Sequence, residues 1–116
     1  MGATRTTPQA KDVTVRSVEP VPGLDELLEA LASLRTRDEY RRFLRDLCTL
    51  SELEALSHRW EIARLLDEGK LPYLDIAQRV GASTTAVTRV SDWLNRGTGG
   101  YRVALERARG KATKGA

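Results

Sequence analysis

Aromatic residues, cysteine and histidine are scarce in this sequence. Phe, Trp and Tyr make up 5% of the residues, which is too few for the aromatic platforms on which single-stranded bases stack. The one cysteine, Cys48, excludes an intrachain disulfide and a multi-cysteine zinc site, and we interpret it as a buried small residue. The one histidine, His58, has no serine, cysteine or carboxylate cluster set for catalysis, and no glycine-rich phosphate loop is present. We therefore expect a protein that is not an enzyme and has no metal site or cofactor.

Long apolar runs are also missing. No stretch approaches the roughly 20 apolar residues that span a bilayer, and the N-terminal sequence MGATRTTPQAK lacks the apolar core of a signal peptide. With 41% hydrophobic and 30% charged residues, the 116-residue chain has the composition of one small globular domain. The sequence therefore predicts no membrane contact and a cytoplasmic location.

The net charge of +3 is unevenly distributed along the chain. Residues 96–116 carry six basic side chains against one acidic side chain, whereas residues 23–95 have a net charge of −3. Basic ends on a near-neutral body are typical of a protein that meets a polyanion at its edges. The alternative is that the basic ends only keep the protein soluble.

The first 22 residues form a segment without hydrophobic periodicity. They hold three of the four prolines of the chain among threonine, serine and charged residues, and we expect a flexible arm. Arg5, Lys11 and Arg16 would allow the arm to reach DNA phosphates, and an idle tail is the alternative.

Two amphipathic helices are predicted after the arm, and capping boxes mark the starts of the second helix and of the third. Leucines recur at three- and four-residue steps over residues 24–34 and give one apolar stripe. Thr36 and Glu39 form a T-x-x-E capping box for the second helix, and Ser51 and Glu54 form another for the third. The arginines of the second helix alternate with acidic residues, so a solvated face with i,i+4 ion pairs is favoured over a phosphate patch.

The third helix is apolar over an unusually wide arc and is expected to end near Gly69. A helix of this kind should be buried on two sides, which a few short helices cannot easily supply. We therefore expect a partner subunit to cover one side, and hence an obligate homodimer. The stripe consists of Leu53, Leu56, Trp60, Ala63 and Leu66, and Ile62 and Leu65 widen it.

Residues 73–94, YLDIAQRVGASTTAVTRVSDWL, predict two short helices with a break between them. Gly81 suits a left-handed backbone conformation, and Ser83 can cap the second helix. Ala77 is small enough to let the two helices cross closely. This spacing is typical of a helix-turn-helix, and a plain helical hairpin is the alternative. The apolar positions are Ile76, Ala77 and Val80 on the first helix and Val87, Val90, Trp93 and Leu94 on the second.

The second helix of this pair would enter the major groove of a double-stranded DNA operator N-terminus first. Thr84 and Thr85 are expected to read bases, because short hydroxyls bond base edges and threonine methyls contact the thymine methyl. Ser83, Thr88, Gln78 and Arg79 are expected to contact mainly the DNA backbone. The near-zero charge of residues 73–94 leaves a second hypothesis open, in which the pair serves protein–protein contact.

Beyond Asn95 the sequence RGTGG predicts a hinge. Residues 101–109 are loosely periodic and predict a short helix, and residues 110–116 are expected to be disordered. The chain thus divides into an arm (1–22), a helical domain (23–95) and a basic C-terminal segment (96–116) that would add salt-sensitive DNA affinity.

Over residues 24–94 the chain resembles the Trp repressor superfamily, and within it the bacterial YerC/YecD-type TrpR-related proteins. The resemblance rests on EALSHRWEIARLLDEG and IAQRVGASTTAVTRVSDWL. It implies an all-helical, intertwined homodimer with a helix-turn-helix on each side, acting as a sequence-specific transcriptional regulator of repressor type.

The resemblance also identifies candidate effector-binding residues. Tryptophan-responsive members hold the corepressor between two arginines, and the matching positions are Arg59 and Arg89. A guanidinium offers a fork for a carboxylate and a flat face for an aromatic ring. Those members have glycine where this chain has Val90, and a hydroxyl residue where it has Ala86, so we expect no response to tryptophan. A salt bridge to Glu52 or Glu61 is the alternative for Arg59, and a DNA phosphate contact is the alternative for Arg89.

Overall fold

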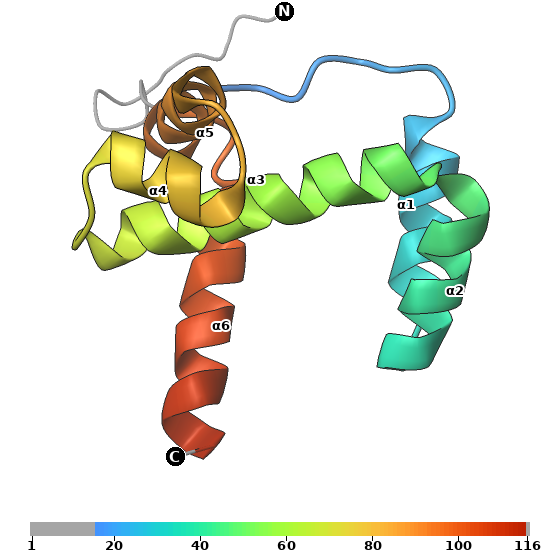
Figure 1. Cartoon of the computed structure of the whole chain (residues 1–116). Helices are drawn as coiled ribbons and strands as arrows, with labels where there is room; N and C mark the ends of the chain where they lie inside the picture. Colours follow the sequence, from blue (N-terminus) through green and yellow to red (C-terminus); the bar gives the residue numbers. More distant parts are fainter. Residues whose placement is uncertain (1–15, 116) are drawn as a thin grey trace, which may run out of the picture. The chain divides into compact units, whose positions relative to one another are not determined.

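The structure is a computed structural model that describes the backbone of residues 16–115 and the side chains of residues 16–111. Over this range it contains six α-helices and no strand, so the predicted all-α fold is confirmed (Figure 1). Residues 1–15, with the predicted DNA-contacting Arg5 and Lys11, lie outside the described range. The helices are α1 (Leu24–Ser33), α2 (Arg37–Leu47), α3 (Leu50–Glu68), α4 (Tyr73–Val80), α5 (Thr84–Arg96) and α6 (Gly100–Gly115). None of the described helices is long and apolar enough to cross a membrane.

The chain divides into two compact units. One unit is Val18–His58, which holds α1, α2 and the first part of α3. The other unit holds the rest of α3, the helices α4 to α6, and residues 16 and 17 from the N-terminal side of the chain. We call them the α1–α2 unit and the α4–α6 unit.

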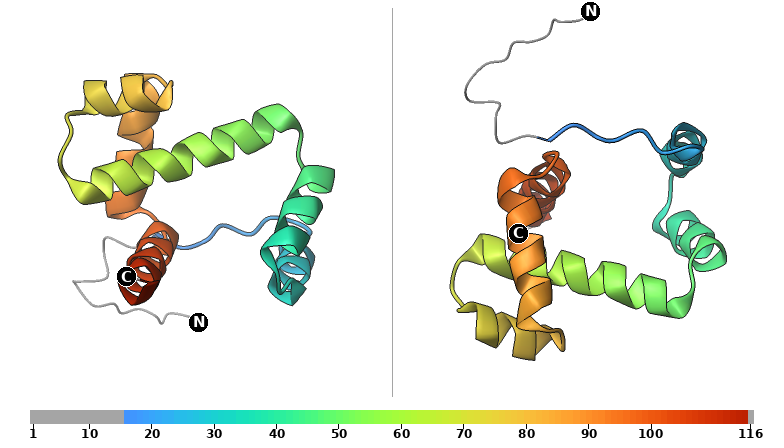
Figure 2. Two further views of the ribbon diagram at one scale, coloured as in Figure 1. Left: turned by 60° about the horizontal axis from the view of Figure 1, so that its bottom comes forward. Right: turned by 90° about the horizontal axis from the view of Figure 1, so that it is seen from above.

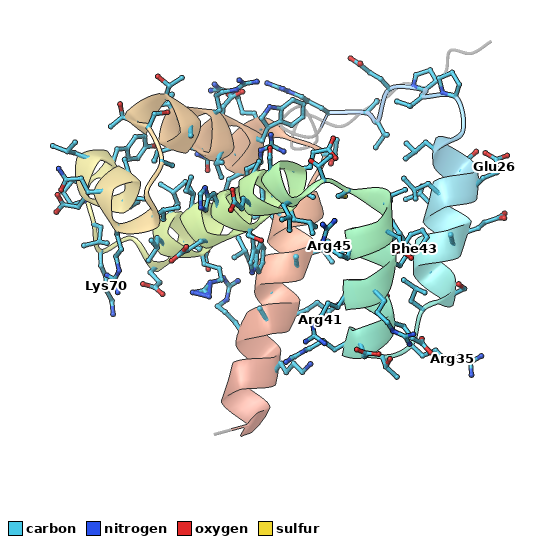
Figure 3. The ribbon with its side chains drawn as sticks, turned by 45° about the vertical axis from the view of Figure 1, so that its right-hand side comes forward. Glu26, Arg35, Arg41, Phe43, Arg45 and Lys70 are labelled. Atoms are coloured by element: carbon cyan, nitrogen blue, oxygen red, sulfur yellow. The ribbon has the colours of Figure 1, made fainter. Side chains whose placement is uncertain are left out.

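In the α1–α2 unit no residue is fully buried within the single chain. Phe43 lies between α2 and α1, whereas Arg41 and Arg45 project from the opposite side of α2 (Figure 3). Apolar side chains remain exposed along all three helical segments of the unit, and Leu50 keeps 61% of its surface. The unit therefore has amphipathic helices but lacks a closed core of its own.

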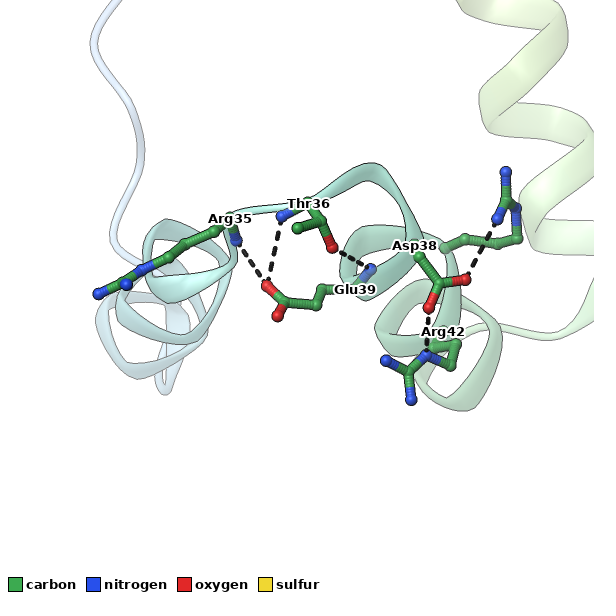
Figure 4. A network of polar contacts seen from close by, with 6 residues as sticks. Arg35, Thr36, Asp38, Glu39 and Arg42 are labelled. Atoms are coloured by element: carbon green, nitrogen blue, oxygen red, sulfur yellow. Dashed lines mark hydrogen bonds and ion pairs between the residues drawn. The ribbon is translucent and has the colours of Figure 1, made fainter.

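The start of α2 is the capping box that the sequence predicts. The Thr36 hydroxyl accepts a hydrogen bond from the Glu39 N–H at 3.1 Å, and the Glu39 carboxylate accepts from the backbone N–H groups of Thr36 (3.3 Å) and Arg35 (2.7 Å) (Figure 4). In the same first turn, Asp38 accepts a hydrogen bond from Arg42 at 2.9 Å, an i,i+4 pair of the kind expected for a solvated face.

The start of α3 differs from the prediction by two residues. Thr49 and Glu52 form the capping contacts, with the Glu52 N–H 3.1 Å from the Thr49 hydroxyl and the Thr49 N–H 2.8 Å from the Glu52 carboxylate. Ser51 and Glu54, the predicted pair, lie inside the helix. The sequence satisfies the [ST]-x-x-E pattern twice, and the helix adopts the earlier start because this adds helical residues without losing a cap.

The α4–α6 unit contains the hydrophobic core. Helices α4 and α5 pack against the C-terminal part of α3 (Figure 2). Partly buried Trp60, Leu71 and Tyr101 pack against the same core. The wide apolar arc of α3 is thus partly explained within one chain, since Ile62 and Ala63 are completely buried here. The buried cluster consists of Ile62, Ala63, Leu65, Ile76, Ala77, Val80, Val87 and Val90.

Helix α6 runs further than the sequence predicts. It continues through Gly110 to Gly115 instead of ending near residue 109. Alanine, lysine and arginine are good helix formers, and a single interior glycine lowers helix stability by only about 1 kcal/mol. Tertiary contacts also hold the helix, because Leu105 is buried and Arg109 forms an ion pair with Asp67 at the end of α3.

The position of the α3 cap is testable by substitution. We expect Thr49→Ala to lower the free energy of unfolding by about 1 kcal/mol, because the Glu52 N–H loses its acceptor. Ser51→Ala is the matched control and should change stability by less than about 0.5 kcal/mol, as an exposed substitution within a helix. Urea unfolding followed by circular dichroism measures both. A larger loss for Ser51→Ala than for Thr49→Ala would restore the original prediction.

Candidate nucleic-acid interface

Helices α4 and α5 form a tight pair joined by a three-residue turn, residues 81–83. Gly81 has φ 80° and ψ 37°, the left-handed conformation that glycine adopts at least cost. The N–H groups of Gly81 and Ala82 both donate to the carbonyl of Ala77 at 2.9 Å, which closes the end of α4. The turn therefore has the conformation that the glycine position predicts.

Ser83 caps α5, also as predicted. Its Oγ accepts a hydrogen bond from the Ala86 N–H at 3.0 Å. A hydroxyl that accepts in this way still has its own hydrogen to donate. The first turn of α5 therefore presents a hydroxyl donor beside free backbone N–H groups at a helix N-terminus, where anions are favoured.

The inner face of the pair is apolar and closely packed. Ile76 and Val87 are completely buried, and Ala77 and Val90 are nearly so, in agreement with the prediction for these positions. Trp93 departs from it, since 45% of its surface is exposed. It lies at the edge of the buried arc of α5, and helical periodicity alone does not specify how wide that arc is.

The predicted DNA-contacting residues are all exposed on the surface. The Thr88 hydroxyl donates to the Thr84 carbonyl at 3.0 Å, which leaves its oxygen free only as an acceptor. The side chains of Thr84 and Thr85 have no hydrogen-bond partner within residues 16–111. The exposed set is Gln78, Arg79, Ser83, Thr84, Thr85, Thr88 and Arg89, from the end of α4 to the middle of α5.

A cavity of about 810 Å³ adjoins this surface between α3, α5 and α6. Three members of the predicted DNA-contacting set, Ser83, Thr85 and Arg89, lie in its wall together with Arg59; the other four do not. None of the described residues that line it is acidic, and Arg59 and Arg89 give this part of its wall a positive charge. The remaining lining residues are Trp60, Ala86, Val90, Trp93, Thr98, Gly100, Tyr101 and Ala104.

The structure brings Arg59 and Arg89 to one cavity, as their predicted shared role requires. Neither forms an ion pair or side-chain hydrogen bond in the described part of the chain, so the alternative salt bridge from Arg59 to Glu52 or Glu61 is absent there. Burial raises the pKa of the Tyr101 hydroxyl, and the positive charge of Arg59 opposes that rise.

Sequence reasoning missed the contribution of α6 to this cavity. Gly100, Tyr101 and Ala104 line it from the first turns of α6. The periodicity of residues 101–109 predicted a helix, but it did not indicate which side chains of α3 and α5 that helix would face across the cavity. No group of three or more potential metal ligands occurs among the described residues.

The second half of α5 is connected by hydrogen bonds to both neighbouring helices. The Tyr73 hydroxyl at the start of α4 donates to Ser91 Oγ at 2.6 Å, and Asn95 Nδ2 donates to the same oxygen at 3.4 Å. Asn95 Oδ1 in turn accepts from Arg102 of α6 at 3.0 Å. These hydrogen bonds hold the second half of α5, whereas the Thr84 and Thr85 side chains in its first turn have no hydrogen-bond partner within residues 16–111.

The fold thus defines an all-helical protein built around a tight pair of short helices. Comparison with known families matches the Trp repressor protein family over residues 22–109, and the chain belongs to that family. The chain is 41% identical over 91 residues to the uncharacterised protein YerC of Bacillus subtilis (strain 168), covering 78% of this chain and 86% of YerC.

Solved structures agree with this assignment. A TrpR-like protein from Eubacterium eligens ATCC 27750 is 41% identical, with a TM-score of 0.71 over 76% of this chain and 90% of that protein. A candidate Trp repressor from Staphylococcus aureus is 37% identical, with a TM-score of 0.72 over 78% of this chain and 89% of that one.

Proposed function

We propose that this protein is a sequence-specific DNA-binding transcriptional regulator of repressor type that acts as a homodimer. The α4–α5 pair is its helix-turn-helix, and the first half of α5 enters the major groove. The observation that carries the proposal is the division of α5: its inner face is buried against α4, while the polar residues of its first turns are exposed, and the Thr84 and Thr85 side chains have no hydrogen-bond partner among the described residues. Membership of the Trp repressor family supports the same function.

Thr84 and Thr85 are the base-reading residues in this proposal. Both are exposed in the first turn of α5, and their hydroxyls are free to bond base edges. Ser83, Gln78 and Arg79 contact phosphates, since Ser83 retains a donor and the other two side chains are exposed at the end of α4. Few long donors project from this surface, so water and DNA shape contribute to specificity.

Arg59 and Arg89 bind an anion, and we propose that this ligand is not tryptophan. The described residues of their cavity supply hydroxyl and aromatic groups and no carboxylate, which suits a DNA phosphate or an acidic effector. Val90 lines the cavity with the β-branched side chain that argues against an indole. Thr85 and Arg89 face the same space, so a phosphate at Arg89 would lie beside the base-reading helix.

A homodimer follows from the exposed apolar surface of the α1–α2 unit. This unit has no buried residue within one chain, yet its helices are amphipathic, and Leu56 of α3 keeps 45% of its surface. Apolar surface of this extent is normally covered in solution. A second copy of the chain supplies the cover, as the two-sided apolarity of α3 predicts.

Selection of bound fragments from genomic DNA tests sequence-specific readout. We expect the wild-type protein to enrich one sequence class, and the double variant Thr84→Ala/Thr85→Ala to lose that enrichment because its base contacts are removed. Loss of two base contacts should weaken binding to the enriched site by roughly 10- to 100-fold. Ser51→Ala, an exposed hydroxyl outside the interface, is the control and should retain the wild-type selection.

Enrichment of the same sequence by the double variant would refute readout by these threonines. Absence of DNA binding by the wild-type protein even at low salt would refute the proposal as a whole. It would favour the alternative of a helical protein–protein interaction module.

Sedimentation equilibrium tests the dimer. We expect a dimer at micromolar concentration for the wild-type protein, and an increase of about 100-fold or more in the dissociation constant for Leu56→Glu, because a charge would be buried in the interface. Leu74→Glu is the matched control: Leu74 lies on α4, is 57% exposed, and should tolerate the charge without loss of the dimer. A well-folded wild-type monomer at this concentration would contradict the proposal.

A further inference from the structure

Arg16, the first residue that the structure describes, contacts the C-terminal end of α5. Its Nη2 lies 3.2 Å from Oδ2 of Asp92, an ion pair between residues 76 positions apart in the sequence. Its guanidinium carbon lies 4.3 Å from the centroid of the Trp93 ring. Its backbone N–H donates to the carbonyl of Gly97 at 2.8 Å. Three different kinds of interaction thus fix one residue on the junction between α5 and α6.

Asp92 accepts from a second arginine besides Arg16. It also forms an ion pair with Arg96 one turn further along α5. The hydrogen bond from Arg96 lowers the pKa of the Asp92 carboxyl below its ordinary value; desolvation opposes this, and the charges of Arg96 and Arg16 lower the pKa further. The Asp92 carboxylate is thus shared by two guanidinium groups.

Trp93 contacts both Arg16 and the turn that follows α5, while 45% of its surface stays exposed. Gly97 is buried, and a Cβ at this position would lie 2.2 Å from the Trp93 carbonyl oxygen and 3.0 Å from Cε3 of the ring. Only glycine permits that approach. The guanidinium, the indole ring and the Gly97 backbone therefore form one packed assembly, and Trp93 is at the same time part of the cavity wall.

We propose that Arg16 is a positioning residue for α5, and that the chain at Arg16 acts as a strap across the α5–α6 junction. The strap adds to the hydrogen bonds through Ser91 and Asn95, so that the second half of α5 is fixed while its first half is presented outward. The effect on DNA affinity rests on the proposed function, whereas the strap itself does not.

The geometry distinguishes a strap from an arm that touches DNA. The Arg16 guanidinium is already engaged by Asp92 and Trp93. Trp93 follows Thr85 by two helical turns, so at 1.5 Å per residue Arg16 lies about 12 Å along the helix from the proposed base contacts. Arg16 therefore acts on DNA affinity through the orientation of α5, not by neutralising a phosphate.

Amide hydrogen exchange on the full chain without DNA tests the strap. Arg16→Met keeps the aliphatic stem and removes the charge, and it should speed exchange at the helical amides of residues 93–96, in the last turn of α5, by about three- to tenfold, the combined value of an exposed ion pair and a cation–π contact. Arg16→Lys restores the charge and should recover part of the protection. Arg107→Met is the matched control: it removes an exposed guanidinium on α6 that forms no ion pair among the described residues, and it should leave these amides unchanged. Wild-type exchange rates in Arg16→Met would overturn the strap.

Operator affinity measured at several salt concentrations tests the positioning role. Arg16→Met should weaken binding by about three- to tenfold at every salt concentration, with the slope of log K against log salt unchanged. A slope smaller by about 0.9 would show a lost phosphate contact, and an unchanged affinity would show no role; either result overturns the proposal. If the wild-type protein binds no DNA, the proposed function fails, and the exchange measurement alone decides whether the strap exists.

Discussion

Helix α4 packs against α5 through small and β-branched side chains, and the remaining features of the α4–α6 unit depend on that contact. Ala77 allows the close approach, Gly81 allows the sharp turn, and Val87 fills the space between the helices and α3. Because the inner face of α5 is occupied in this way, its outer face has a fixed orientation. The polar residues of its first half therefore form a surface of defined shape, as a major-groove reader requires.

The two units differ in how far their side chains are buried, and this difference bears on whether the chain needs a second copy to fold. Every fully buried side chain among the described residues belongs to the α4–α6 unit, whereas the α1–α2 unit has amphipathic helices without a core. A domain of this size buries only a modest fraction of its surface on folding, so apolar surface left exposed costs it stability that it can hardly lose. A dimer in which a second chain completes the α1–α2 unit would make folding and assembly the same event, and it would also set the spacing of two recognition helices.

Local signals in the sequence predicted most of the helices and the α4–α5 turn correctly. Gly81, Ser83 and the Thr36–Glu39 box act over one helical turn, so their effects can be read from neighbouring residues. The start of α3 could not be decided in this way, because two overlapping boxes satisfy the same pattern. The contact of Arg16 with Trp93, and the α6 wall of the cavity, join residues far apart in the chain and have no periodic signature.

In the proposed function, the first half of α5 and the end of α4 form the DNA-binding surface. Nuclear magnetic resonance of the protein titrated with its selected operator duplex locates that surface residue by residue. We expect the amide signals of residues 78–89 to shift strongly and those of residues 91–97 to stay near their free positions. Shifts centred on residues 91–97 or on α1 and α2, with residues 83–89 unchanged, would contradict it.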